Sequence, residues 1–514
     1  MLRRSTANAR GVLATAAVVL TALFVVVATA SATPPGRGAK HPGGQGTNQG
    51  AGAKTGSKTQ DAGPQANHGA RGRGKPETVS CGEQVTHSLR VANDIGPCPG
   101  DGLDVVASGI TVDLNGHTIT GSHGSPTAPS GQQQVTDPAT GGTVTVTGHE
   151  QVGINLDGVS NVIVKGSNCP NPAGHEAPGQ CKRRSTVQLF DAGVAINDGG
   201  HNLVQGIDAK DNINYNVVYH TGNNDQNPTS QMQYGALVST CDYGDGITTD
   251  NSTGNLIRGN TLDHNGPYSG VSLVDSSDGN LVRGNTVEHQ TVAAMDPTGK
   301  STVCGASFFF HIGMQLGRGS QDVGIRVEGP GANNDTVSGN VVTDSMLAGI
   351  SMNSYVCQQP SEAGNKPPEP PNTNATIDGN IVTGVSAGSA ITTFASGPQG
   401  TITCPAYDNT ITSNTVSNAT GSGTGFGDGV FIASMSTGNS VRGNTSNNNS
   451  RDGIELGGPF TSGAHSYPGA TGNTVSGNRA HGNADYDGAD RTPGCDSNTW
   501  TGDSFGTVNQ PCVQ

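Results

Sequence analysis

The fragment Asn-x-hydrophobic-x-Gly-Asn-x-hydrophobic recurs along this chain, and no other feature restricts the possible folds as strongly. Complete copies begin at Asn255 and Asn280. Altered or shortened copies begin at Asn202, Asp335, Ile377, Asn409, Asn439, Asn473 and Asn498. Because a unit repeated along a chain folds as one stacked element of an array, the sequence predicts a solenoid.

A second fragment, Gly-[Ile/Val]-x-hydrophobic, precedes these copies. It begins at Gly153, Gly193, Gly270, Gly324, Gly349, Gly429 and Gly453, with shortened forms at Gly246 and Ala390. Both fragments alternate apolar and polar residues, which is the period of a β-strand. The least interrupted units, 246–270 and 429–453, repeat after 24 residues. At roughly 3.3 Å per residue such a unit holds about three short strands, whose apolar faces are stable only when units stack.

The Asn of the Gly-Asn step suits the same architecture. Asn tolerates turn conformations, and identical amides stacked about 4.8 Å apart form hydrogen-bonded ladders. The alternative is a β-sandwich with unrelated Asn-Gly turns, but a sandwich has no reason to repeat the surrounding apolar positions. We therefore expect an amide ladder along a solenoid axis.

With these repeats, the chain resembles the right-handed parallel β-helix proteins, and within them the secreted NosD-type repeat proteins of actinobacteria. The resemblance covers residues 79–514 and also rests on the opening segment 102–119, with Asn115-Gly116-His117, and on the closing segment 495–512. It implies an all-β domain of about ten rungs with three short strands each and a cap at either end. These motifs are specific for the fold and weak for activity, since this fold carries lyases, hydrolases, epimerases and adhesins.

The N-terminus has the pattern of an export signal. Three arginines precede an apolar run from Gly11 to Ala30, and small residues follow. We expect residues 1–32 to be a signal peptide, with an uncleaved membrane anchor as the alternative. Residues 33–78 are rich in Gly, Pro and basic residues, so we expect a disordered linker. The protein is therefore expected to be secreted.

The charge of the repeat domain restricts its partners. Of the 26 Lys and Arg and 40 Asp and Glu residues, 16 and 38 fall in residues 79–514, a net charge of −22. Such a surface repels nucleic acid. The basic linker could contact anionic cell-wall polymers or lipid, or act as a plain spacer. We expect a monomer.

Ten cysteines in an exported chain predict five disulfides. Cys357 and Cys404 lie in insertions at the same place in two consecutive units, and neighbouring rungs are only about 4.8 Å apart. This register predicts a Cys357–Cys404 bond. Spacing alone leaves the other connectivities open; we expect Cys81–Cys98 and Cys495–Cys512 at the two ends, Cys169–Cys181 within one insertion, and Cys241–Cys304.

The register also indicates which side chains face outward beside the two longest insertions, 208–245 and 288–323. β-helix enzymes resembling pectate lyases work on the outside of a sheet, in a groove walled by such insertions. Near the middle of the Gly-Ile strands the outward residues include Asp250, Arg326 and Glu328. We expect these three as catalytic residues, because carboxylates can serve as acid and base and Arg can hold a uronate. The expected substrate-binding residues in the insertions are Tyr219, Tyr243, Asp245 and His311.

Two functions remain open. The first is binding or processing of an extracellular polysaccharide or cell-wall glycan, by a lyase or glycoside hydrolase if the protein is an enzyme. The second is a non-catalytic surface scaffold or adhesion protein, in which Asp250 and Arg326 form an ordinary surface ion pair. The epimerase branch of the fold uses Asp-Pro-His, whereas this chain has Asp296-Pro297-Thr298. The His and Met residues are scattered, so we predict no metal or other cofactor, apart from calcium on the carboxylates.

Overall fold

The computed structural model describes the repeat region in detail. The described residues are 75–122, 151–167, 184–212, 245–265, 269–274, 276–289, 323–328, 331–345, 348–353, 373–386, 388–393, 406–421, 426–462 and 465–514, with strand segments at 132–136, 143–147, 217–219, 237–239, 356–357 and 402–403. The expected signal peptide and nearly all of the expected linker lie outside these residues. Among the described residues, no helix has the length and apolar character needed to cross a bilayer.

Three twelve-stranded sheets make up the fold, and every strand pair within them is parallel. The first sheet contains β1 (Glu83–Val85), β4 (Leu103–Val105), β9 (Val152–Asn155), β12 (Ala192–Asn197), β17 (Asp245–Asp250), β20 (Ser269–Val274), β23 (Val323–Glu328), β26 (Ala348–Asn353), β30 (Ser389–Thr393), β34 (Val430–Ile432), β37 (Ile454–Leu456) and β42 (Gly488–Asp490). The second contains β2 (Leu89–Arg90), β5 (Thr111–Asp113), β10 (Ile163–Lys165), β13 (Leu203–Gln205), β18 (Leu256–Arg258), β21 (Leu281–Arg283), β24 (Thr336–Ser338), β28 (Thr376–Asp378), β32 (Thr410–Thr412), β35 (Ser440–Arg442), β40 (Thr474–Ser476) and β43 (Thr499–Thr501). The third contains β3 (Ile95–Cys98), β6 (Thr118–Gly121), β11 (Ser185–Gln188), β14 (Ile207–Lys210), β19 (Thr261–Asp263), β22 (Thr286–Glu288), β25 (Val341–Thr343), β29 (Ile381–Thr383), β33 (Thr415–Ser417), β36 (Thr445–Asn447), β41 (Arg479–His481) and β44 (Ser504–Phe505).

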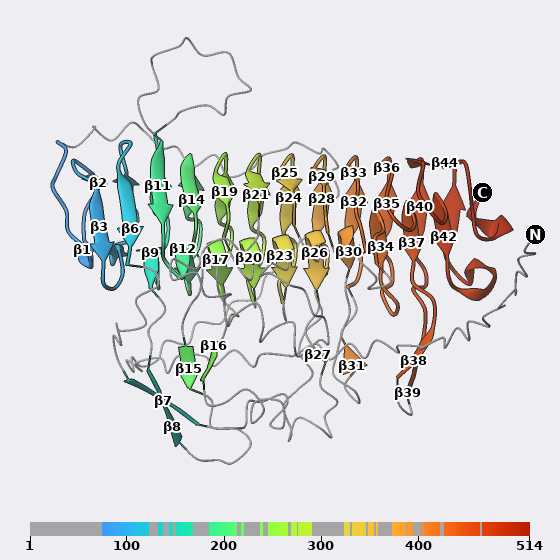
Figure 1. Cartoon of the computed structure of the whole chain (residues 1–514), viewed down its shortest axis with the longest axis horizontal. Coiled ribbons are helices and arrows are strands. Elements are labelled where there is room, and N and C mark those ends of the chain that lie inside the picture. Colours follow the sequence, from blue (N-terminus) through green and yellow to red (C-terminus); the bar gives the residue numbers. More distant parts are fainter. Residues whose placement is uncertain are drawn as a thin grey trace, which may run out of the picture.

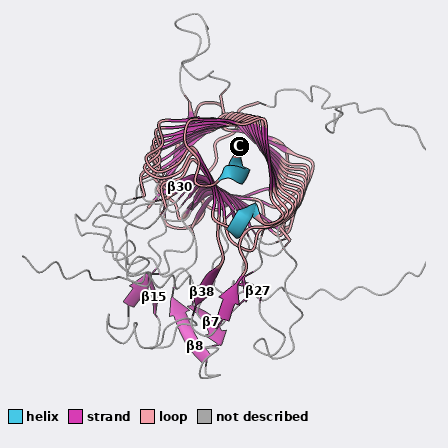
Figure 2. Cartoon of the chain, turned by 90° about the vertical axis from the view of Figure 1, so that its right-hand side faces the viewer, coloured by secondary structure: helices cyan, strands magenta, loops and turns pink. Residues whose placement is uncertain are grey.

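Each turn of the coil contributes one strand to each sheet, so the fold is a parallel β-helix of twelve rungs (Figure 1). The sequence predicted this architecture and about ten rungs; the additional rungs include short terminal strands such as β1 and β44, which carry little of the repeat. Viewed end-on, the three sheets enclose the interior of the coil (Figure 2). At a spacing of about 4.8 Å, twelve rungs extend for roughly 53 Å.

The core consists of one stacked column of aliphatic side chains for each inward-facing repeat position. Ile257, Val282 and Val337 occupy one such position in consecutive rungs of the second sheet and are fully buried. A single hydrophobic cluster runs from Val79 to Val513. Since each rung shields its neighbours, removing one side chain affects mainly adjacent rungs.

Amide ladders support the corners of the coil. In the ladder of the Gly-Asn step, each Asn Nδ2 donates to the Oδ1 of the Asn on the next rung at 2.9–3.0 Å, from Asn260 through Asn444. The predicted ladder is thus confirmed. Two further ladders occur, one at the first Asn of the repeat, as between Asn439 and Asn473, and one after the third sheet, as between Asn449 and Asn483.

The two repeat glycines have different physical roles. The Gly before Asn takes a positive φ, 60° at Gly259 and 64° at Gly477, a conformation that suits a residue without a side chain. The Gly of the Gly-Ile fragment faces the core instead. A Cβ at Gly246 would lie 2.6 Å from both the Gly270 carbonyl oxygen and the Leu262 side chain. Only glycine therefore fits there without displacing the next rung.

Small antiparallel strand pairs project from the coil. They are β7 (Gln132–Thr136) with β8 (Thr143–Thr147), β15 (Val217–Tyr219) with β16 (Leu237–Ser239), β27 (Val356–Cys357) with β31 (Ile402–Thr403), and β38 (Phe460–Ser462) with β39 (His465–Tyr467). All four lie on the side of the coil that carries the first sheet (Figures 1 and 2). The pairing of β27 with β31 shows that the insertions holding Cys357 and Cys404 lie side by side, as the register predicted.

Disulfides close both ends of the coil. The expected pairs Cys81–Cys98 and Cys495–Cys512 are present, each bridging residues 17 apart. The predicted Cys357–Cys404 bond stays a prediction, because Cys404 lies outside the described residues. The same holds for the pairs Cys169–Cys181 and Cys241–Cys304.

Candidate functional site

The outer face of the first sheet carries two parallel rows of side chains, because its strands bend at the Gly-Ile step. Asp245 pairs in register with Ser269 and Ile247 with Val271, while the intervening glycines are left out of the ladder. Since the Cα–H of Gly246 points toward Leu262 in the core, Asp245 before it points outward. The residue before Gly and the second residue after Gly therefore form adjacent outward rows along the sheet.

The middle of this face holds a buried polar group that we call the central cluster, made of Asp245, Ser269, Ser272 and Arg326. The Ser272 hydroxyl donates to Asp245 Oδ1 at 2.7 Å, and Arg326 Nε donates to Ser269 Oγ at 3.2 Å. Burial raises the pKa of Asp245 to about 7, while the Ser272 hydrogen bond and the Arg326 charge oppose the rise. The Asp245 carboxyl therefore changes charge near neutral pH.

The structure brings the three expected catalytic residues to nearby register positions of this sheet, with one difference. Asp250 and Glu328 both pair with Val274, one from each side, so they occupy one register position two rungs apart. Arg326 lies one row away and was expected as an exposed clamp, but it is only 5% exposed. Its guanidinium faces the central cluster, because Ser269 and the charge of Asp245 hold it there.

The four expected substrate-binding residues have different outcomes in the structure. Asp245 is buried within the central cluster rather than lining an open groove. Tyr219 ends strand β15, which lies on the side of the first sheet (Figure 2), and its side chain is not described. Tyr243 and His311 lie outside the described residues.

A row of hydroxyls continues from the central cluster toward the C-terminus. In register, Arg326 is followed by Ser351 and Thr392 on successive rungs. Ser351 is 1% exposed and Thr392 is 5% exposed, and neither Ser351 Oγ nor Thr392 Oγ1 has a hydrogen-bond partner. Phe431 and then Glu455 continue the row. Two buried, outward-directed hydroxyls thus lack partners within the described structure.

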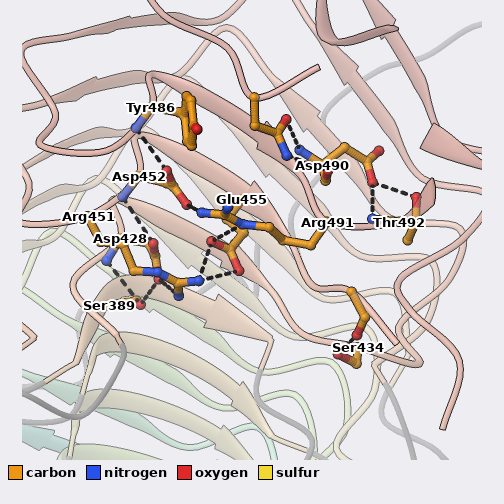
Figure 3. A network of polar contacts seen from close by, with 12 residues as sticks. Ser389, Asp428, Ser434, Arg451, Asp452, Glu455, Tyr486, Asp490, Arg491 and Thr492 are labelled. Carbon is orange, nitrogen blue, oxygen red and sulfur yellow. Dashed lines mark hydrogen bonds and ion pairs between the residues drawn. The ribbon is translucent and has the colours of Figure 1, made fainter. Parts of the chain in front are cut away.

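The row ends in a charged network that we call the C-terminal cluster: Asp428, Arg451, Asp452, Glu455 and Arg491. Figure 3 shows the two guanidinium groups lying between the three carboxyl groups. Arg451 contacts Glu455 at 2.8 Å and Asp428 at 3.4 Å. Arg491 contacts Glu455 at 3.2 Å and also pairs with Asp452. The three carboxyl groups are buried, whereas the arginine side chains are 24% and 30% exposed.

Burial determines the protonation of this cluster. Desolvation, together with the contacts with Asp452 and Asp428, raises the pKa of Glu455 to about 9, although the charge of Arg451 opposes the rise. Burial also raises the pKa of Asp428 to about 6, while Arg451 lowers it. The raised pKa of Glu455 favours its protonated form at neutral pH, which reduces the negative charge that the two guanidinium groups must compensate.

Sequence reasoning missed this cluster, although a signal was present. Aspartate stands directly before the Gly of three units, at Asp428, Asp452 and Asp487, as it does at Asp245. That position precedes the alternating strand pattern from which the outward-facing residues were predicted. Only the bend at the Gly-Ile step shows that it shares the outer face.

Two groups of described residues bring potential metal ligands together, with their ligand atoms within 4.8 Å of one another. In the first, Asp428, Asp452 and Glu455 already contact two arginines that compensate their charge. In the second group, both His264 and His289 pair with Asp263, and Lys210 lies in register with Asp263 on the preceding rung. The view that the histidines are scattered was therefore wrong for His264 and His289, because the coil stacks residues 25 apart.

A separate open groove of about 620 Å³ lies on the third sheet near the N-terminal end. Strands β3, β6, β11 and β14 line it with residues that include Thr118, Thr186, Arg184 and Lys210. It is polar but distant in the fold from both clusters of the first sheet. It therefore provides a comparison surface on the same coil.

Comparison with known proteins gives a limited result. No protein-family model matches the chain, and the search of curated proteins finds no match. Among solved structures, the A-module of mannuronan C-5 epimerase AlgE6 from Azotobacter vinelandii is 10% identical, with 84% of this chain and 86% of that chain covered and a TM-score of 0.39. A mutant of the periplasmic alginate epimerase AlgG is 11% identical over 81% of this chain and 77% of its own, with a TM-score of 0.39. A mutant tailspike protein of E. coli bacteriophage HK620, in complex with a pentasaccharide, is 11% identical over 78% of this chain and 55% of its own, with a TM-score of 0.43. Likenesses this weak say nothing about the chemistry of the site.

Proposed function

We propose that this protein is secreted and binds an extracellular polysaccharide along the outer face of its first sheet. The proposed surface extends from the central cluster to the C-terminal cluster. The observation that carries the proposal is the pair of buried, outward-directed hydroxyls of Ser351 and Thr392, which have no partner.

A buried hydroxyl without a hydrogen bond reduces the free energy of unfolding by about 1–3 kcal/mol, so two of them lower the stability of the free protein. Sugar hydroxyls offer both donors and acceptors, and they can satisfy these groups when the ligand displaces the atoms that bury Ser351 and Thr392 in the free protein. Arg326 and Glu455 lie four register steps apart, which is roughly 19 Å at the rung spacing. An extended ligand fits such a straight and regular row better than a compact one does.

The small strand pairs support the same face. All four project on the side of the first sheet, where they can flank a bound chain (Figures 1 and 2). The disulfides at both ends of the coil suit an oxidising compartment outside the cytoplasm.

Cleavage of the bound polysaccharide is a second candidate function, favoured by the placement of Asp250 and Glu328. Their shared register position, two rungs apart, separates the two backbones by roughly 9–10 Å. Pairs of carboxyl groups on either side of a glycosidic bond act as acid and base or as acid and nucleophile. In this reaction Arg326 would act as a positioning residue, through its interaction with Asp245 in the central cluster.

The binding proposal is tested on an array of uronate-containing and neutral glycans with purified protein. We expect wild type to bind at least one glycan, and Ser351→Ala/Thr392→Val to bind it about tenfold more weakly, as expected for the loss of one or two hydrogen bonds. The matched control is Thr186→Val in the groove of the third sheet, which should bind like wild type. If wild type binds no glycan, the scaffold function replaces this proposal; if only the control loses binding, the site lies on the third sheet.

The cleavage proposal has its own test. Wild type is incubated with each glycan that it binds, and reducing ends and ultraviolet-absorbing unsaturated products are measured. Asp250→Asn and Glu328→Gln should each abolish product formation while leaving glycan binding in place. Equal product formation by wild type and both variants would refute the assigned roles, and no product from wild type would leave a binding protein.

A further inference from the structure

A column of acidic residues and histidines follows the third sheet. The turn after β14, β19, β22 and β25 places Asp211, His264, His289 and Asp344 at one position on four successive rungs, with φ values of 55°, 52°, 50° and 55°. Backbone bonds connect these rungs, including Asp211 N–H to the Asp263 carbonyl at 3.0 Å. The rigid coil therefore fixes the separation of the side chains before any ligand arrives.

Two histidines in this column approach one carboxylate oxygen. His264 Nδ1 lies 2.7 Å and His289 Nδ1 lies 3.2 Å from Asp263 Oδ1. The imidazole rings stack with centroids 5.3 Å apart and an angle of 22° between their planes. Their side chains are 31% and 53% exposed, and that of Asp263 is 28% exposed, so solvent reaches all three.

We propose that Asp263, His264 and His289 bind a divalent transition-metal ion of the borderline class, with Zn²⁺ as the representative ion. Two imidazole nitrogens with one carboxylate oxygen form a donor set typical of such ions. In a tetrahedral zinc site with ligand bonds of about 2.0–2.1 Å, neighbouring donor atoms lie roughly 3.3 Å apart. The two histidine–carboxylate separations are 2.7 and 3.2 Å, and all three donor atoms lie within 4.8 Å of one another, so side-chain rotations can bring them to one ion.

Neighbouring acids strengthen the site. Asp344 Oδ2 lies 3.8 Å from His289 Nε2, on the side of the ring away from Asp263. A carboxylate behind a metal-bound histidine orients the ring and increases its basicity. Asp211 interacts with the charge of His264 from the preceding rung and with that of Lys210, which lies in register with Asp263. The acids around the column favour a bound cation.

Other histidine–carboxylate contacts in the described structure lack this convergence. His117 pairs with Asp94 at 3.1 Å and His87 pairs with Glu77 at 3.1 Å, each as one ring against one carboxylate. Only the column brings two rings to one oxygen among the described residues. The site is also independent of the proposed glycan surface, because its ligands lie on the third sheet and the turns that follow it, whereas the glycan surface lies on the first sheet.

The test measures Zn²⁺ binding to the purified chain by isothermal titration calorimetry and metal content after dialysis. We expect one Zn²⁺ per chain in wild type and at least a tenfold weaker affinity in His264→Ala/His289→Ala. Asp344→Asn should weaken binding by a smaller factor, and His117→Ala is the matched control expected to match wild type. Far-ultraviolet circular dichroism confirms that each variant is folded.

A titration with Co²⁺ provides a second readout, because its visible absorption reports nitrogen and oxygen ligands. The absorption should appear in wild type and in His117→Ala, and disappear in the double variant. The proposal is overturned if wild type retains no Zn²⁺, or if the double variant binds Zn²⁺ as tightly as wild type.

Discussion

Replacing Asn414 by Ala tests how much a single rung of the amide ladder contributes to stability. Asn414 uses its whole hydrogen-bonding capacity: Nδ2 donates to the Ile377 carbonyl at 2.9 Å and to Asn444 Oδ1 at 3.0 Å. Its Oδ1 accepts from Asn380 N–H at 2.9 Å and from Asn380 Nδ2 at 3.0 Å. The side chain is buried at the corner between the second and third sheets.

The magnitude follows from the groups that lose partners. In Asn414→Ala, the Asn380 backbone N–H, one Asn380 Nδ2 hydrogen and the Ile377 carbonyl lose theirs. Asn444 Oδ1 keeps its bond from the Asn414 backbone N–H at 2.9 Å. At about 1–3 kcal/mol for each unsatisfied buried group, the change should cost roughly 3 kcal/mol or more. Because each rung contacts only its neighbours, the loss should be local.

The assay is hydrogen exchange followed by mass spectrometry, together with urea unfolding. Exchange should accelerate in the rungs of β28, β32 and β35 and stay unchanged near β5 and β10. The control is Asn448→Gly, since Asn448 is exposed with a φ of 56° that glycine also adopts. If Asn414→Ala lowered the free energy of unfolding by no more than the control does, the ladder would not stabilise the coil as argued.

Four further predictions concern stability. Asp335 stands in an amide ladder with a buried Oδ2 that has no partner, and burial raises its pKa well above the ordinary value, so Asp335→Asn should raise Tm at neutral pH; an unchanged or lower Tm would count against this. The folded pKa of Glu455, about 9, exceeds its ordinary value of 4.5, so the stabilising effect of Glu455 is complete below about pH 4.5 and is lost as the pH rises toward 9. Glu455→Gln should therefore flatten the pH dependence of hydrogen exchange in the last rungs. An unaltered profile would contradict the raised pKa. A Cβ at Gly453 would lie 2.5 Å from the Asp487 carbonyl oxygen, so Gly453→Ala should destabilise the coil by about 1–3 kcal/mol in urea unfolding. Reduction of Cys495–Cys512, which closes a 17-residue separation, should cost up to about 3 kcal/mol and increase exchange in the C-terminal cap, whereas unchanged exchange would show that the bond is dispensable.

Most of the architecture could be predicted from the repeats because the constraint is periodic. The alternation around Asn255 and Asn280 indicated strands, and the Gly-Asn step indicated a ladder. The second and third ladders were not predicted, since Asn439 and Asn449 each also look like ordinary turn residues. Only their alignment between rungs, as with Asn473 and Asn483, shows that they stack.

The candidate site was less predictable than the fold, because its residues meet where the backbone departs from the regular strand pattern. Arg326 was correctly assigned to the outer face, but its burial depends on neighbours that a strand pattern does not show. The C-terminal cluster needs the bend at the Gly-Ile step, which turns Asp428 and Asp452 outward. His264 and His289 lie in turns, where the strand pattern does not indicate which residues are neighbours. The coil nevertheless brings both to one oxygen of Asp263.

The central claim is that the outer face of the first sheet binds a polysaccharide through hydroxyls that lack partners in the free protein. Measuring both Tm and glycan Kd for Thr392→Val tests it most directly. The variant should be at least as stable as wild type, because it removes an unsatisfied buried hydroxyl worth about 1 kcal/mol or more, and it should bind glycan about three- to tenfold more weakly. A variant that binds as tightly as both wild type and Thr186→Val would contradict the claim.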